Sequence, residues 1–179
     1  AASADESARV RVAALVSLVK EETDPALASF AEMVFEEAFS WGTAAAAARV
    51  RVAASEDKVE WIESALKRSS PHDVLRASLF GLLGEQEDPR AAGILRAWSL
   101  DEEVNAKARA AAVIALVLVS RNDPDTVALL AGFLEGAPYA LQSAAVNGLA
   151  ISRAASARRV LAAKYSSLID PRQRRVVEA

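Results

Sequence analysis

The prolines of this chain stand where helices can begin, and their spacing constrains the fold more than any other feature of the sequence. Five of the six prolines directly follow an aspartate or a serine, side chains that readily cap a helix N-terminus. The pairs are Asp24-Pro25, Ser70-Pro71, Asp88-Pro89, Asp123-Pro124 and Asp170-Pro171, and the uncapped sixth is Ala137-Pro138. Each pair therefore predicts the start of a helix and not a kink within one.

The predicted helix starts form two interleaved series with a common period. Starts near Pro71, Val104, Pro138 and Pro171 lie 33, 34 and 33 residues apart, and starts near Pro25, Asp57, Pro89 and Pro124 lie 32, 32 and 35 apart. Two helix series at one period indicate a repeat of two helices. A single pair has too little apolar surface to be stable alone, so we expect the pairs to stack and bury a continuous core.

A motif of small residues recurs in the first series of helices. Its first and fifth places are small and a leucine follows, as in Ala77 to Leu82, Ala111 to Leu116, Ala144 to Leu149 and Ala13 to Leu18. Positions four residues apart share one helix face, so the motif predicts that a neighbouring helix approaches closely there. The segment 44–54 departs from it, because Arg49 stands at the fifth place.

The Asp-Pro pairs and this motif resemble the HEAT/armadillo class of α-helical repeats. The resemblance implies an all-α fold, an α-solenoid of about five antiparallel helix pairs, with residues 1–179 as a single helical-repeat domain. A hydrophobic content of 53% with only seven glycines also favours helix. The last predicted helix begins at Pro171 and stops after nine residues, so we expect the chain to be a fragment of a longer one.

The only histidine, His72, lies in the stretch Ser69 to Asp73, where a serine and an aspartate flank it. Adjacent and i+2 side chains on a helix point apart, so Ser70, His72 and Asp73 cannot form a local catalytic triad. We interpret the stretch as a helix start, with Ser70 as N-cap, Asp73 returning a bond to the cap and His72 exposed.

The chain lacks most of the residues from which metal and cofactor sites are usually built. One histidine and no cysteine do not make a zinc site, and no glycine-rich phosphate loop occurs. Two carboxylate clusters, Glu32 with Glu36 and Glu37 and Glu21 with Glu22 and Asp24, could hold a hard cation or form a solvated surface, which we expect. We therefore expect no catalytic residue, no cofactor and no metal.

The tryptophans and a basic cluster are the candidates for an interaction surface. Trp98 and Trp41, the latter in line with Phe30, Val34 and Ala38, fall on apolar helix stripes and are expected in the core. Trp61 lies at the flank of its stripe, so it either anchors a partner or packs between repeats. The basic cluster comprises Arg158, Arg159, Lys164, Arg172, Arg174 and Arg175. The predicted interaction surface is Trp61, Arg158, Arg159, Arg172, Arg174 and Arg175.

Charge and hydropathy exclude some partners. Residues 104–179 carry a net charge of +5 and residues 1–103 carry −8, but the pI of about 5.3 and the absence of interleaved aromatics argue against nucleic acid. The longest uncharged apolar run, Ala110 to Val119, is far shorter than the roughly 20 residues that span a bilayer. We expect a soluble protein without a membrane span, in a compartment that the sequence does not indicate.

Three functions are consistent with these patterns. We expect a non-catalytic scaffold in which the second helices line a groove that receives a protein or peptide. The segment Glu56 to Pro89, with Trp61 and Asp88-Pro89, is also similar to the C-terminal helical domain of aminopeptidase-N-type zinc peptidases. That resemblance implies an accessory domain that shapes the substrate cavity of a catalytic domain in the same full-length chain. A helical-repeat enzyme acting on nucleic acid or a pigment is the third alternative, and no catalytic constellation supports it.

Overall fold

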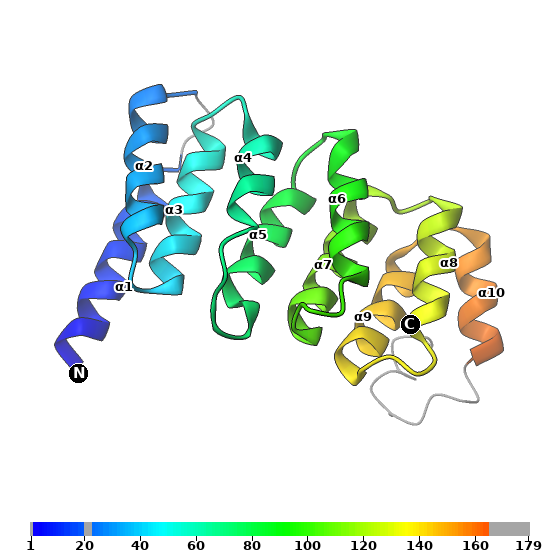
Figure 1. The fold of residues 1–179 in the computed structure, drawn as a ribbon. Coiled ribbons are helices and arrows are strands. Elements are labelled where there is room, and N and C mark those ends of the chain that lie inside the picture. Colours follow the sequence, from blue (N-terminus) through cyan, green and yellow to red (C-terminus); the bar gives the residue numbers. More distant parts are fainter. Residues whose placement is uncertain (1, 20–22, 165–179) are drawn as a thin grey trace. The chain divides into compact units, whose positions relative to one another are not determined.

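The computed structural model describes residues 2–19 and 23–164, with only the backbone for residues 2–6. The chain is all-α, as predicted, and no strand occurs in those residues (Figure 1). The helices are α1 (Ala2–Ser17), α2 (Pro25–Glu37), α3 (Trp41–Ala53), α4 (Lys58–Ala65), α5 (Val74–Gly84), α6 (Pro89–Leu100), α7 (Ala106–Val119), α8 (Pro124–Phe133), α9 (Tyr139–Ile151) and α10 (Ala155–Lys164), and a 3-10 turn, η1 (Pro71–Asp73), precedes α5. None of these helices is long and apolar enough to cross a membrane.

The Asp-Pro pairs begin helices as predicted. Pro25, Pro89 and Pro124 open α2, α6 and α8, and the preceding aspartate of each accepts one or two backbone N–H groups. Helices α3, α5, α7 and α9 begin 32 or 33 residues apart, and α2, α4, α6, α8 and α10 begin 31 to 35 apart. The helix starts therefore keep the predicted period, whereas the Asp170-Pro171 start lies outside the described residues.

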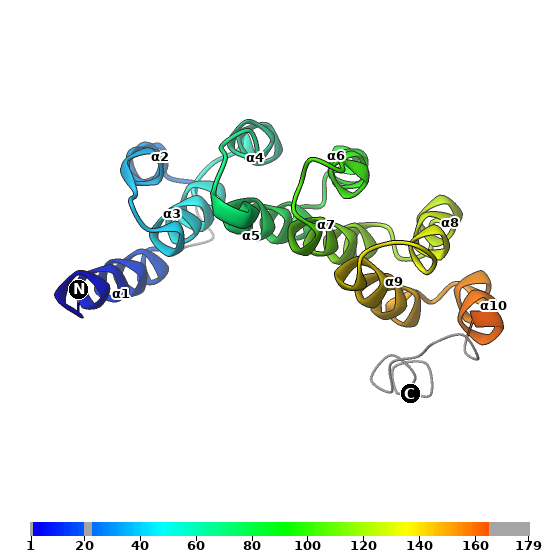
Figure 2. The ribbon, with the colours of Figure 1, turned by 60° about the horizontal axis from the view of Figure 1, so that its bottom comes forward.

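The chain divides into two compact units, residues 1–82 and 83–179, and the boundary falls within α5. In the first unit α3 packs against α1, α2 and α4. Figure 2 shows α2 and α4 on one side of this unit, with α1 and α3 on the other. In the second unit α7 packs between α6 and α9, and α8 and α10 pack on α9.

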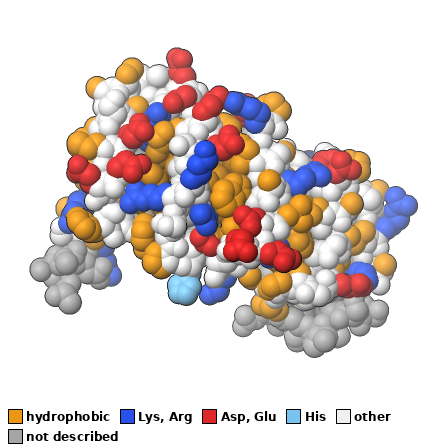
Figure 3. Space-filling model, viewed as in Figure 1, with side chains coloured by type: hydrophobic (Ala, Val, Ile, Leu, Met, Phe, Trp, Pro, Cys, Tyr) orange, Lys and Arg blue, Asp and Glu red, His pale blue; other side chains and the backbone are white. Residues whose placement is uncertain are grey.

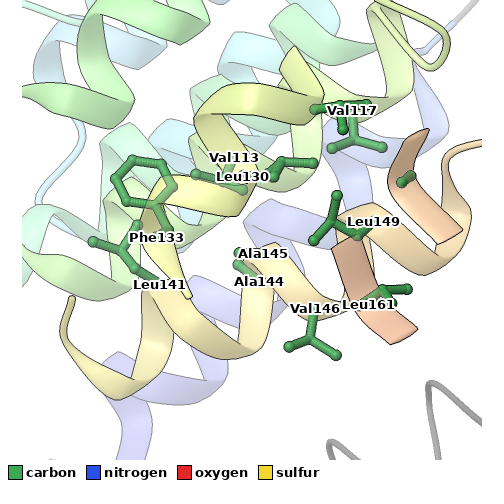
Figure 4. Close-up of a cluster of buried hydrophobic side chains, with 12 residues drawn as sticks. Val113, Val117, Leu130, Phe133, Leu141, Ala144, Ala145, Val146, Leu149 and Leu161 are labelled. Carbon is green, nitrogen blue, oxygen red and sulfur yellow. The ribbon is translucent and has the colours of Figure 1, made fainter. Parts of the chain in front are cut away.

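The core of the second unit forms where α7, α8, α9 and α10 meet (Figure 4). Its members are aliphatic side chains and one aromatic: Val113, Val117, Val127, Leu130, Phe133, Leu141, Val146, Leu149 and Leu161, with alanines between them. A Cβ at Gly148 would lie 2.8 Å from Val117 Cγ2, so the small residue allows α9 to approach α7 closely, as the motif predicted.

At Gly81 the prediction that a neighbouring helix approaches closely is wrong. That glycine is exposed and a Cβ there would meet nothing within 4 Å. The close approach occurs three residues later, where a Cβ at Gly84 would lie 2.9 Å from Ala115 Cβ and 3.1 Å from its Cα. The face that α5 turns to its neighbour is therefore rotated from the one that the motif indicated.

The stretch around His72 is a helix start, but its geometry differs from a simple cap. Helix α5 begins only at Val74, and the N–H of Leu75 donates to Ser70 Oγ at 3.0 Å across the intervening turn. His72 and Asp73 both have φ of 54°, a left-handed conformation that costs non-glycine residues energy. The Asp73 carboxylate binds Arg76 at 2.7 Å, and His72 is exposed as predicted.

Candidate interaction surface

A buried arginine connects α2, α3 and α4 in the first unit. Arg51 of α3 is only 8% exposed. Its Nη1 and Nη2 donate to the two carboxylate oxygens of Asp57 at 2.9 and 3.1 Å, and its Nε donates to Glu32 at 3.2 Å. Asp57 stands at the N-cap position of α4 but makes no side-chain cap, because its carboxylate is held by the guanidinium. No pattern in the sequence indicates this cluster.

The cluster shifts the pKa of both partners in the direction that strengthens the ion pair. Hydrogen bonds from Arg51 hold the pKa of Asp57 below its usual 3.8, against a smaller opposing effect of burial. Burial alone would lower the pKa of Arg51, but the hydrogen bonds with Asp57 and Glu32 raise it above its usual range. Both groups are therefore charged at neutral pH, and the ion pairs of Arg51 link α3 to α2 and to the start of α4.

Trp61 is part of the same core and is not exposed at the surface. It is 8% exposed, its ring meets Phe35 edge-on at a centroid distance of 5.1 Å, and the Arg51 guanidinium lies 5.4 Å from its ring centroid. Of the two interpretations, the surface anchor is therefore wrong and packing holds. Trp41 and Trp98, which were expected in the core, are instead half-buried.

Helix α2 presents its apolar residues on two faces. The buried face carries Ala28, Ala31 and Phe35. The expectation that Phe30 belongs to the core is wrong, because Phe30 is 45% exposed, and Met33 beside it is 50% exposed. With Ala26, which is exposed, they follow the spacing i, i+4, i+7 and form one outward ridge of the helix.

A groove of about 710 Å³ adjoins the C-terminal end of this ridge. Its lining comes from α1 (Arg11), the end of α2 (Val34, Glu36 and Glu37), the following loop (Ala38 and Phe39) and α3 (Thr43). Phe39 is fully exposed in that loop. We call the exposed side chains of Ala26, Phe30, Met33 and Phe39, together with this groove, the α2 surface.

The α2 surface is apolar and bordered by negative charge. Glu36 and Glu37 are exposed in the last turn of α2, which contains no basic residue, so they add to the negative end of the helix dipole. Two arginines lie near them. Arg11 donates to Ser7 on its own helix, and Arg68 donates to the carbonyl oxygens of Phe35 and Ala38. Figure 3 shows hydrophobic, acidic and basic side chains interspersed on the face that α2 and α4 turn to the viewer.

The predicted basic cluster is only partly described. Arg158 and Arg159 are exposed on α10, and Lys164 at the end of that helix pairs with Glu135. Arg172, Arg174 and Arg175 lie outside the described residues. The structure therefore brings together two neighbouring members of the predicted interaction surface, and it places Trp61 in a core.

The first carboxylate cluster, Glu32 with Glu36 and Glu37, does not form a cation site in the described residues. Glu32 is drawn toward Arg51, away from a shared ligand position with Glu36. Within residues 2–19 and 23–164 no group of three or more histidine, aspartate or glutamate side chains is placed to hold a metal ion. The second predicted cluster includes Glu21 and Glu22, which lie outside these ranges.

Comparison with known proteins identifies no relative: no family model, no curated protein and no solved structure matches the chain.

Proposed function

We propose that this protein is a non-catalytic helical-repeat scaffold, a HEAT-like α-solenoid that binds a protein or peptide at the α2 surface. The observation that carries the proposal is the exposure of Phe30 and Met33 on one ridge of α2, together with an exposed Phe39 that lines a groove at the C-terminal end of the helix. Monomeric proteins rarely expose large contiguous apolar patches, and patches of this kind commonly serve as interaction sites.

A recurring hydrogen bond supports the repeat architecture. The Nε of Arg76 in α5 donates to the carbonyl oxygen of Leu66 at 2.9 Å, and the Nε of Arg109 in α7 donates to that of Ser99 at 3.0 Å. The two donors are 33 residues apart, as are the two acceptors. Each arginine thus joins the first turn of one helix to the C-terminal end of the helix before it, at the period of the helix starts.

The proposal is tested by selecting ligands without assuming their identity. A displayed library of random peptides is panned against the full chain, and the enriched peptides are assayed on variants. We expect these peptides to lose about tenfold or more in affinity for a Phe30→Ser, Met33→Ser double variant, because each buried apolar side chain contributes roughly 1.5 kcal/mol or more.

Val74→Ser is the matched control, because Val74 is 50% exposed on α5 and does not belong to the α2 surface. Circular dichroism establishes that each variant retains its helix content. Peptides that bind the double variant as tightly as the wild type would refute the α2 surface as the binding site.

A further inference from the structure

We propose that the partner of the α2 surface is a basic amphipathic helix, an inference that depends on the proposed function. Three features of the first unit lead to this partner: the charge around the surface, the shape of the apolar ridge and the paired backbone of α2. Together they favour a cationic helix over an extended peptide or a second copy of the chain.

The first feature is charge. Residues 24–37 and 56–67, which contain α2, α4 and the turns before them, carry eight acidic side chains and two lysines. Arg51, which approaches from α3, is buried and paired with Glu32 and Asp57. Arg11 lines the groove together with Glu36 and Glu37, and Arg68 binds the backbone at the end of α2. With these two arginines and Arg51 counted, eight acidic side chains stand against five basic ones, so this part of the first unit keeps a net charge of −3. Lysine or arginine side chains on a partner would complement that charge.

The second feature is the shape of the ridge. Ala26, Phe30 and Met33 follow the spacing at which one helix meets another, with Phe39 beyond the helix end. Methionine and phenylalanine side chains adapt to the apolar stripe of a helix, and methionine is common on surfaces that bind helices of differing sequence. The ridge therefore fits a stripe of leucine or isoleucine on a partner helix.

The third feature is the backbone. The N–H and C=O groups in the middle of α2 are paired within the helix, so α2 offers no free edge to an extended strand. An extended peptide lying on the apolar ridge would leave its own backbone groups without partners, which is costly. A helix satisfies its backbone internally and can lie on the ridge at no such cost.

A second copy of the chain fits this surface poorly. Packing α2 against α2 of another molecule would bring Glu36 and Glu37 of the two copies to one interface. Like charges placed together at an interface disfavour association. The same carboxylates attract a helix with lysines or arginines beside its apolar stripe.

Three synthetic helices about four turns long, sharing one length and one pattern, test this inference against the full chain. The first has a leucine stripe flanked by lysines, the second has the same stripe flanked by glutamates, and the third keeps the lysines but has serines in the stripe. Binding is measured by fluorescence anisotropy of the labelled peptides. We expect the first peptide to bind about tenfold or more tightly than either of the others.

Variants of the protein separate the contribution of the apolar ridge to binding from that of the carboxylates. Phe30→Ser with Met33→Ser should weaken binding of the lysine–leucine peptide, and Glu36→Gln with Glu37→Gln should reduce its preference over the glutamate–leucine peptide. Glu102→Gln with Glu103→Gln, which removes two exposed adjacent carboxylates of the second unit, is the matched control and should change neither.

Each other outcome has a distinct meaning. Equal binding of the lysine–leucine and glutamate–leucine peptides, both sensitive to Phe30 and Met33, would refute the basic partner and leave the proposed binding surface intact. Equal binding of the two lysine peptides would reveal unspecific charge attraction and overturn the inference. Absence of binding by all three would also contradict it, and the library selection would then decide whether the α2 surface binds another class of ligand.

Discussion

The Arg51 cluster shows how one buried charge can position three helices. Its acceptors come from α2 and from the residue before α4, and both carboxylates remain about half exposed while the guanidinium is buried. The sequence could not indicate this arrangement, because Glu32 lies 19 residues from Arg51 and no helical or strand period joins them. Arg49, which departs from the small-residue motif two residues earlier, is exposed.

The stability of the first unit should depend on the ionisation of Asp57. Its folded-state pKa lies below the usual 3.8, so its contribution is fully present at neutral pH and is lost as the pH falls below 3.8. We expect Asp57→Asn to lower the free energy of unfolding at pH 7 by about 1 kcal/mol, a modest value because the carboxylate is solvent-accessible. Urea denaturation of both proteins from pH 7 downward measures the difference, which should narrow below pH 3.8.

Glu63→Gln is the matched control for the loss of one negative charge, since Glu63 is an exposed carboxylate of the same helix. A difference between wild type and Asp57→Asn that stays constant from pH 7 down to about pH 3 would show that the Arg51 pair contributes no pH-dependent stability.

At the scale of the element, the sequence predicted where helices begin better than which face they bury. Helix starts depend on local chemistry, proline and a capping side chain, which a sequence displays directly. Burial depends on neighbours. Helix α2 has apolar residues on two faces, so the pattern could not decide between Phe30 and Phe35, and the structure buries Phe35. For the same reason the sequence pattern could not show that Trp61 is buried and that Phe30 and Met33 are exposed.

Two helix glycines should respond in opposite directions to alanine. Gly93 lies inside α6 with nothing within 4 Å of a Cβ, so Gly93→Ala should stabilise the protein by about 0.5–1 kcal/mol through helix propensity. Gly84→Ala would place its Cβ 2.9 Å from that of Ala115 and 3.1 Å from its Cα, so overpacking should cost about 1–3 kcal/mol. Thermal and urea unfolding of the two single variants provide the comparison.

Each variant controls for the other, because both exchange the same residue types. Equal stabilisation by both substitutions would mean that Ala115 does not pack against Gly84 as the structure has it.

At the scale of the whole molecule, the proposed repeat architecture implies that each helix pair contacts mainly its neighbours, so local damage need not spread through the chain. The division at residues 82 and 83 places Ile62 in the core of one compact unit and Leu149 in the core of the other, and both side chains are fully buried. Truncating either to alanine should destabilise its own unit by about 2–5 kcal/mol. These two substitutions therefore measure how far cooperativity extends.

Amide hydrogen exchange followed by mass spectrometry resolves the effect along the chain. We expect Leu149→Ala to accelerate exchange in α7, α8 and α9 and to leave α2, α3 and α4 protected, and Ile62→Ala to give the reverse pattern. The reason is that each substitution opens a cavity among the helices of one unit, whereas the other unit keeps its own core. If either variant instead accelerates exchange equally in both sets of helices, the chain unfolds as a single cooperative body and the two units have no independent stability.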